Sequence, residues 1–196
     1  MEDVIHAQAM AYLTGTLGDN AAGIRITGID TGGPGPRVRW EIPRLSRPRV
    51  SDRGEIYRHG VTDLISRMIA LRWAGGQEHR EPPPESYLDL HRDYPTVFTD
   101  TLETPAGWHW MLEAAAEAIL EQGVPEGSRT CQVKQKLGTL RWYVRGSTPE
   151  SMLLVINSAE WLSGAVCEHC GAPGSVRPGG WIRTLCDDHA DQKRRR

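Results

Sequence analysis

The chain alternates between two patterns of apolar residues. In four segments the apolar side chains lie three or four positions apart, as in an α-helix that buries one face. In four shorter segments they alternate with polar residues, as in a half-buried β-strand. The helical segments are 3–18, 51–73, 105–123 and 149–164, and the alternating segments are 24–27, 37–42, 130–136 and 139–145.

Residues at the ends of the helical segments support this prediction. Asp3, Ser51 and Thr148 are the residue types that cap helix N-termini, and Pro149 fits a first helical turn. Gly123 is expected to end the third helix, because glycine readily adopts the left-handed backbone conformation found there.

The order helix, strand, strand, helix occurs twice. Turn-forming sequences at 31–36 and at Leu137-Gly138 would join the two pairs of strands. We therefore predict an α+β fold with two helix-hairpin-helix (αββα) units, antiparallel strands and a small treble-clef zinc finger. Segments 38–42 and 140–144 resemble each other, through duplication or because both are amphipathic strands. The predicted parts are an N-terminal αββα unit at 1–76, a Pro-rich irregular linker at 77–103, a second αββα unit at 104–164, and the zinc finger with a basic tail at 165–196.

Composition narrows the class of protein. Of 196 residues 39% are hydrophobic and 24% charged, which suffices for a buried core. The formal net charge of -2 gives no overall positive field, so binding to nucleic acid or anionic lipid would need a local patch. The acidic start is unlike a secretory signal, and no apolar run approaches the roughly 20 residues of a membrane helix. We expect a cytoplasmic protein without membrane contact.

A metal-binding motif lies near the C-terminus. Cys167 and Cys170 form a CxxC pair, and Cys186 and His189 form a CxxH pair after fifteen intervening residues. Zinc prefers four such ligands in a tetrahedron, and each two-residue gap lets one pair bind one edge of it. His169 competes with Cys170 as a ligand, but the CxxC geometry favours Cys170. The order knuckle, hairpin and short helix predicts a treble clef.

The ligand set indicates a structural metal. Four good ligands close the coordination shell, and three thiolates weaken the ion as a Lewis acid. Nucleases with this finger need a histidine base and another polar ligand on the hairpin, yet residues 171–185 contain no histidine, aspartate or glutamate. We expect one structural zinc ion, no catalytic residues and no small-molecule substrate.

Other histidines have weaker claims. His109 stands between two tryptophans at a helix start, which favours a buried, hydrogen-bonded role, while His59, His79 and His91 lack a recognisable motif. An enzyme would require a cleft that gathers His59, His91 or His109 with acidic partners.

Basic residues cluster in three places. Each cluster is either a solvated face or a site for phosphate or an acidic protein surface. The clusters are Arg37, Arg39, Arg44, Arg47 and Arg49; Lys134, Lys136, Arg141 and Arg145; and the tail Lys193, Arg194, Arg195 and Arg196.

Several motifs of residues 91–190 occur together in a family of bacterial and phage proteins without a known reaction, and the chain resembles that family. They are Tyr94-Pro95 with Phe98, Gly107-Trp108, Gln132-Val133-Lys134, Lys136-x-Gly138-Thr139-Leu140-Arg141-x-Tyr143, Ala159-Glu160, Cys167-x-x-Cys170-Gly171-Ala172-Pro173-Gly174 and Gly180-Trp181-Ile182-Arg183-Thr184-Leu185-Cys186-x-x-His189. The chain departs from the pattern at Leu137, where the family has an aromatic residue, and it lacks a cysteine-bearing insert before Gly107.

The resemblance implies a zinc finger and a mobile-element setting. We expect a non-enzymatic zinc-binding effector, encoded by a phage or prophage, that binds a host protein complex in antidefence or transcription modulation. The alternative is direct nucleic-acid binding through the arginine-rich hairpin and basic tail, and an enzyme such as a nuclease is the third reading. The salt dependence of binding distinguishes protein binding from nucleic-acid binding, because affinity that depends on phosphate contacts falls steeply with ionic strength.

Overall fold

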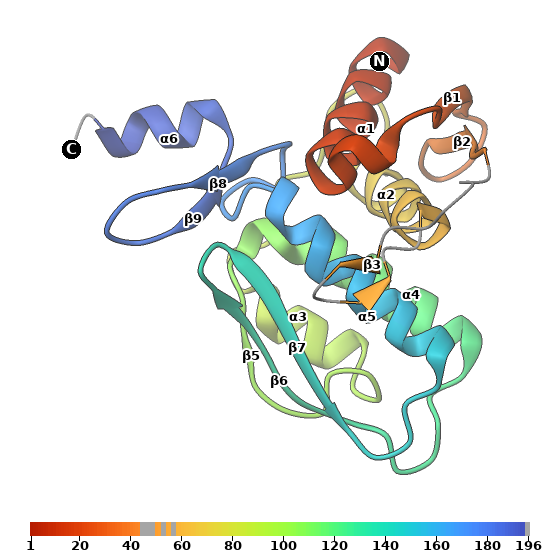
Figure 1. Ribbon diagram of the computed structural model, residues 1–196, viewed down its shortest axis with the longest axis vertical. Coiled ribbons are helices and arrows are strands. Elements are labelled where there is room, and N and C mark those ends of the chain that lie inside the picture. The colour runs from red at the N-terminus through yellow and green to blue at the C-terminus, as the bar shows by residue number, and fades with distance from the viewer. Residues whose placement is uncertain (44–49, 52–53, 56–57, 195–196) are drawn as a thin grey trace.

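A computed structural model describes residues 1–43, 50–51, 54–55 and 58–194 as a mixed α+β protein (Figure 1). The helices are α1 Glu2–Leu17, α2 Arg58–Arg72, α3 Ser86–Asp93, α4 His109–Gln122, α5 Glu150–Leu162 and α6 Asp187–Arg194, with short 3-10 turns η1 Gly18–Ala21, η2 Ala106–Trp108 and η3 Ser163–Ala165. The strands are β1 Arg25–Asp30, β2 Arg37–Glu41, β3 Val50–Ser51, β4 Gly54–Glu55, β5 Leu102–Glu103, β6 Arg129–Lys136, β7 Thr139–Arg145, β8 Ser175–Arg177 and β9 Arg183–Leu185. Within this described part, no helix is both long and apolar enough to cross a membrane.

The strands form small separate sheets. β1 pairs with β2, β3 with β4 and β8 with β9, all antiparallel. β6 and β7 pair antiparallel as predicted, and β5 adds a parallel edge that the sequence did not suggest. Leu137 and Gly138 both have positive φ values, 53° and 79°, which is the backbone of a tight hairpin turn.

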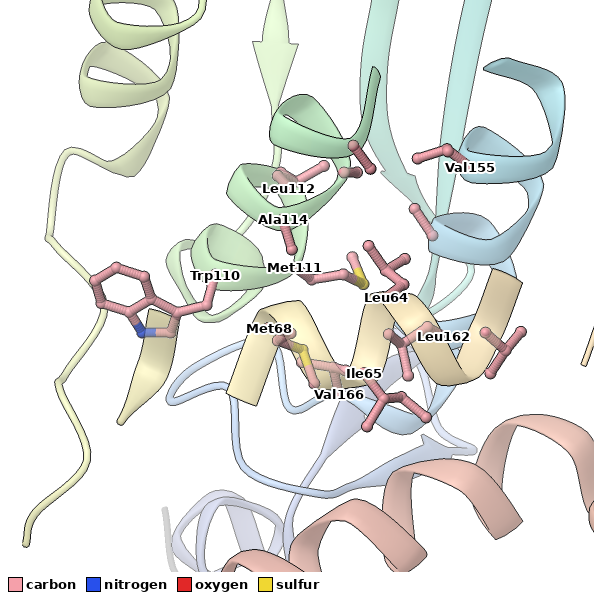
Figure 2. Close-up of a cluster of buried hydrophobic side chains, with 14 of the residues drawn as sticks. Leu64, Ile65, Met68, Trp110, Met111, Leu112, Ala114, Val155, Leu162 and Val166 are labelled. Carbon is pink, nitrogen blue, oxygen red and sulfur yellow. The ribbon is translucent and has the colours of Figure 1, made fainter. Parts of the chain in front are cut away.

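The helices pack around α2. It contacts α1, α4 and α5, and α4 also contacts α5. Figure 2 shows Leu64, Ile65 and Met68 of α2 among side chains of α4, α5 and the segment at Val166. The buried apolar residues from Ile5 to Val166 belong to one cluster, so helices of both predicted units share a single core.

None of the three predicted N-cap residues caps its helix. α2 begins at Arg58, whereas Ser51 pairs with Gly54 in a short strand pair. At the fourth helix Pro149 takes the N-cap position, and the Thr148 hydroxyl donates instead to the Gly146 carbonyl. The proline side chain has no oxygen to accept from the first N–H groups of the helix, and Thr148 lies one residue too early to do so. Asp3 also makes no capping hydrogen bond; it lies in the first turn of α1, where its charge favours the helix dipole.

The predicted irregular linker at 77–103 is a further correction. It contains α3 and β5, and it sends Leu90, Val97 and Phe98 into the core at 1% exposure or less. A helix of eight residues has too few turns to show a clear period, and a two-residue strand has none. The segment is therefore an integral part of the fold.

Candidate metal centre

Cys167, Cys170, Cys186 and His189 lie together as a four-ligand cluster. Their ligand atoms are all within 4.8 Å of one another. Cys170 Sγ lies 3.9 Å from Cys186 Sγ, and Cys167 Sγ lies 3.6 Å from His189 Nδ1. Metal–sulfur bonds of about 2.3 Å and metal–nitrogen bonds of about 2.0 Å in a tetrahedron give sulfur–sulfur edges of about 3.8 Å and sulfur–nitrogen edges of about 3.5 Å. The cluster therefore has the dimensions of a site for one structural metal ion.

Backbone hydrogen bonds shape the first ligand pair. Gly171 N–H donates to the Cys167 carbonyl at 3.0 Å, and Cys167 N–H donates to the Ala172 carbonyl at 2.8 Å. Gly171 has φ 71°, and a Cβ added there would lie 2.8 Å from the Gly107 carbonyl oxygen. The glycine after the CxxC pair thus provides both the left-handed turn and the close approach to Gly107.

The second ligand pair spans the start of α6. Cys186 follows β9 directly, and Ala190 N–H donates to its carbonyl at 3.0 Å. His189 lies three residues later, so one helical turn brings its Nδ1 to 3.1 Å from Cys186 Sγ. β8 and β9 form the hairpin that connects the two pairs.

The thiols have unequal acidities. A hydrogen bond from Cys170 lowers the pKa of Cys167 to about 4. The same pairing raises the pKa of Cys170, and burial raises the pKa of Cys186. Cys170 and Cys186 therefore hold their protons more firmly than Cys167 does. A divalent ion reverses that balance, because coordinated thiols lose their protons.

His169 lies outside the ligand set, as predicted. Its ring stacks on His189 with centroids 4.9 Å apart, and its Nε2 lies 3.3 Å from Arg183 Nη1. Burial lowers the pKa of His169, and the neighbouring His189 adds to that effect. The His169 ring thus packs against one of the four ligand residues, His189.

Glu168 is a buried residue that sequence reasoning missed. It is 5% exposed, and its Oε1 accepts from Thr184 N–H at 2.9 Å and from Gln135 Nε2 at 3.1 Å. Its backbone also pairs with Thr184 and with Gly107. One carboxylate therefore ties the CxxC knuckle to β9 and to the β6–β7 hairpin. The one hint of this structural role in the sequence is that Glu168 lies between the metal ligands Cys167 and Cys170.

The body of the protein encloses the knuckle. Trp108 Nε1 donates to the Val166 carbonyl at 3.0 Å, and Tyr12 in α1 donates to the Gly171 carbonyl at 2.5 Å. A Cβ on Gly107 would lie 2.3 Å from the Cys167 carbonyl oxygen. The Gly107-Trp108 motif thus serves close packing against the metal-binding segment.

Arg72 brings a buried positive charge to this region. It is 2% exposed, its Nη1 donates to Gln8 at 2.8 Å, and its Nε has no hydrogen-bond partner among the described residues. Arg72 lies beside Tyr12. Burial raises the pKa of Tyr12, and the positive charge of Arg72 opposes that shift. Three thiolates around a divalent ion leave one negative charge, which would offset this guanidinium.

A second buried polar cluster surrounds His109. Its Nδ1 lies 3.0 Å from Ser86 Oγ, and its Nε2 lies 3.4 Å from Glu113. These are the residue types of a catalytic triad, but Ser86 is 2% exposed and His109 is 6% exposed. The arrangement matches the buried, hydrogen-bonded histidine predicted from the sequence.

A groove of about 940 Å³ lies between β2 and α2. His59 lines it together with Asp63, Glu117 and Glu121. Arg67 binds Asp63 at 2.8 Å and Glu121 at 2.7 Å, so two of these carboxylates are held in ion pairs. Burial raises the pKa of Glu117, and no hydrogen bond among the described contacts joins His59 to any of the three. The groove therefore contains His59 and three carboxylates, but no described hydrogen bond joins the histidine to any of the carboxylates.

His91 and His79 have local partners. His91 Nδ1 bonds the Phe98 carbonyl at 2.9 Å, and His79 Nε2 lies 3.2 Å from Glu81.

The predicted basic clusters are placed only in part. Arg37 and Arg39 are exposed on β2, and Lys134, Lys136, Arg141 and Arg145 lie on the β6–β7 hairpin. Lys193 and Arg194 end α6. Arg44, Arg47, Arg49, Arg195 and Arg196 lie outside the described residues.

Comparisons with protein-family models, with curated proteins and with solved structures gave no match. The site must be interpreted from its own chemistry.

Proposed function

We propose that the protein is a non-enzymatic zinc-binding protein that acts by binding another protein. The donor set supports zinc, because three thiolates and one imidazole are its usual structural ligands. The order of CxxC knuckle, β8–β9 hairpin and α6 supports a treble-clef finger. The two runs of helix, hairpin and helix, α1 to α2 and α4 to α5, support the αββα units on which that finger rests.

One observation carries the protein-binding part: large apolar side chains are exposed where the finger meets the β6–β7 turn. Leu137 is 63% exposed, Trp181 is 65% exposed and Val176 is 44% exposed. Their segments are in contact, since Thr184 Oγ1 donates to the Gly138 carbonyl at 2.6 Å and Val176 pairs with Thr184. We call Leu137, Val176 and Trp181 the apolar tip.

Leu137 strengthens this argument. It is the residue with positive φ among the described non-glycine residues, and bulky side chains rarely adopt that conformation. Asparagine or glycine would suit the turn better. An exposed leucine at a strained position contributes little to folding, so its benefit to the protein lies in contact with a partner.

The partner proposed for the apolar tip is a component of a host protein complex. The resemblance described above supports this choice, because that family has a bacterial and phage setting. Zinc would act by holding the tip in shape, since a segment this short cannot build a core of its own.

Metal analysis tests the first half of the proposal. Protein purified without added chelator should contain one zinc ion per chain by elemental mass spectrometry. The Cys186→Ser variant should contain less than half as much, roughly, because a tetrahedral site loses affinity with each missing ligand. A metal-free wild-type protein with an unchanged fold would refute the zinc assignment.

Quantitative affinity capture tests the second half. Leu137→Asn combined with Trp181→Ala removes the two most exposed side chains of the apolar tip and relieves the strained turn, so stability should not fall. Leu120→Gln is a matched control, because Leu120 is 41% exposed on α4, away from the tip. A specific partner should be recovered with the wild type and the control and be lost with the tip variant. Equal recovery with all three would show that the tip is not the binding surface.

A further inference from the structure

The outer face of the β5–β6–β7 sheet is unusually basic. Val133, Leu140 and Trp142 point into the core from this sheet, so the residues that alternate with them face outward. We call this surface the basic sheet face. Its outward residues are Glu103 on β5, Arg129, Gln132, Lys134 and Lys136 on β6, and Thr139, Arg141, Tyr143 and Arg145 on β7.

The cations oppose one another across the strands. Lys134 is paired with Arg141, and Arg129 is paired with Arg145. Like charges placed directly opposite in an antiparallel pair destabilise a sheet. None of the five cations forms an ion pair within the described part of the chain, although Glu103 shares the face and Asp100 lies near Arg129. A fold that carries two such pairs is suited to a ligand with several negative charges.

Tyr143 stands in the middle of these cations. Its side chain is 45% exposed, and Lys134 Nζ lies 5.6 Å from its ring centroid. Arg141 and Arg145 are two residues away on the same strand and therefore on the same face. An exposed aromatic ring on a sheet face, with cations around it, has the features of a surface on which a nucleic-acid base stacks while phosphates bind nearby.

We infer that the basic sheet face binds single-stranded nucleic acid. Duplex nucleic acid keeps its base faces stacked internally, so it could use the cations but not the ring of Tyr143. An acidic polypeptide could likewise use the cations but has no need of an exposed aromatic face. Charge and aromatic ring together favour an unpaired strand, with one base on Tyr143 and its phosphates on Lys134 and Arg141. This function is separate from the proposed protein binding, because the apolar tip is a different set of residues.

Fluorescence anisotropy with labelled oligo-dT and oligo-U of about 12 nucleotides tests the inference on the zinc-loaded full chain. Lys134→Glu combined with Arg141→Glu should lower affinity by about tenfold or more. Loss of two phosphate contacts should also reduce the slope of log affinity against log salt by about 1.4.

Arg37→Glu combined with Arg39→Glu is the matched control. It makes the same change in net charge on the other exposed hairpin, β1–β2, and should lower affinity by less than about threefold. Equal losses for the two double variants would show that only overall charge matters and would overturn the assignment of this face.

Tyr143 separates stacking from charge. Tyr143→Ala should weaken binding by about tenfold, and Tyr143→Phe should restore it to within about twofold, because phenylalanine keeps the ring. A labelled polyglutamate and a duplex of the same length serve as competing probes. If either binds as tightly as the single strands and Tyr143→Ala changes nothing, the face recognises polyanions in general and the inference is wrong.

Discussion

The two large hairpins of the protein are built from similar sequences but are held very differently. β1–β2 and β6–β7 each follow one helix and precede another, and each carries a tryptophan, Trp40 or Trp142. Trp142 is 5% exposed, stacks on Phe98 with centroids 5.2 Å apart and donates to Thr130 at 3.0 Å. Trp40 is only partly buried and donates to Ser66 on α2 at 2.8 Å.

The difference comes from what surrounds each hairpin. β6–β7 gains a third strand, β5, and its turn is fixed to the metal-binding segment through Gln135, Gly138 and Glu168. Two backbone N–H groups on the edge of β7 that faces away from β6 also find side-chain acceptors. Leu140 N–H donates to Ser163 Oγ, and Trp142 N–H donates to Glu160 Oε1. β1 and β2 form a sheet of two strands only, and this sheet packs against α2. The same local pattern therefore produces a well-anchored hairpin in one place and a peripheral one in the other.

Loss of the metal should produce the largest effect and should separate the two hairpins. Cys186→Ser removes a ligand from a segment whose Cys167 is 0% exposed and which contacts Tyr12 and Trp108. Structural zinc supplies on the order of 10 kcal/mol, comparable to the whole stability of a domain. We expect the free energy of unfolding to fall by more than about 5 kcal/mol in urea denaturation followed by circular dichroism.

Hydrogen exchange of the same variant locates the damage. Amides of 135–140 and 166–174 should lose protection first, while those of β1–β2 should change least. An unfolding curve that overlays the wild type, or equal loss of protection in both hairpins, would contradict the anchoring role given to the metal-binding segment.

The paired tryptophans give the second effect. Trp142→Ala should cost about 3–5 kcal/mol, because it opens a cavity in a closed core beside Phe98. Trp40→Ala should cost about 1–2 kcal/mol, because the site is partly open and solvent can fill it. Chemical denaturation of both variants measures the difference. Equal costs would mean that β1–β2 is held as firmly as β6–β7.

Sequence reasoning recovered the features that depend on local pattern. The metal ligands, the β6–β7 hairpin and the apolar faces of α4 and α5 follow from spacing alone, and the structure brings these residues together. Residues 77–103 were misjudged because Leu90 and Phe98 belong to segments too short to show a period. Glu168 was missed for a related reason: its partners Thr184 and Gln135 are distant in sequence, and no pattern along the chain relates them.

Glu168 should give a smaller but still clear effect. Glu168→Ala leaves Thr184 N–H buried without an acceptor, since Thr184 is 0% exposed. An unsatisfied buried donor costs about 1–3 kcal/mol. Thermal and chemical denaturation should show that loss, and zinc competition with a chelator should show weaker metal retention. A variant as stable as the wild type would mean that the contact between the finger and the β6–β7 turn contributes little.

The ion pair on the other hairpin should give the smallest effect. Arg25 binds Glu41 through two hydrogen bonds of 2.9 Å and 2.8 Å, a geometry that would be strong in a buried site. However, the two side chains are 70% and 52% exposed, so water and salt screen the attraction and each chain loses rotational freedom on pairing. Arg25→Ala should therefore change the free energy of unfolding by less than about 0.5 kcal/mol, and the change should vanish at high salt. A larger loss of unfolding free energy that does not change with salt would show that β1–β2 depends on this ion pair as β6–β7 depends on Glu168. The contrast between the two hairpins would then rest on packing alone.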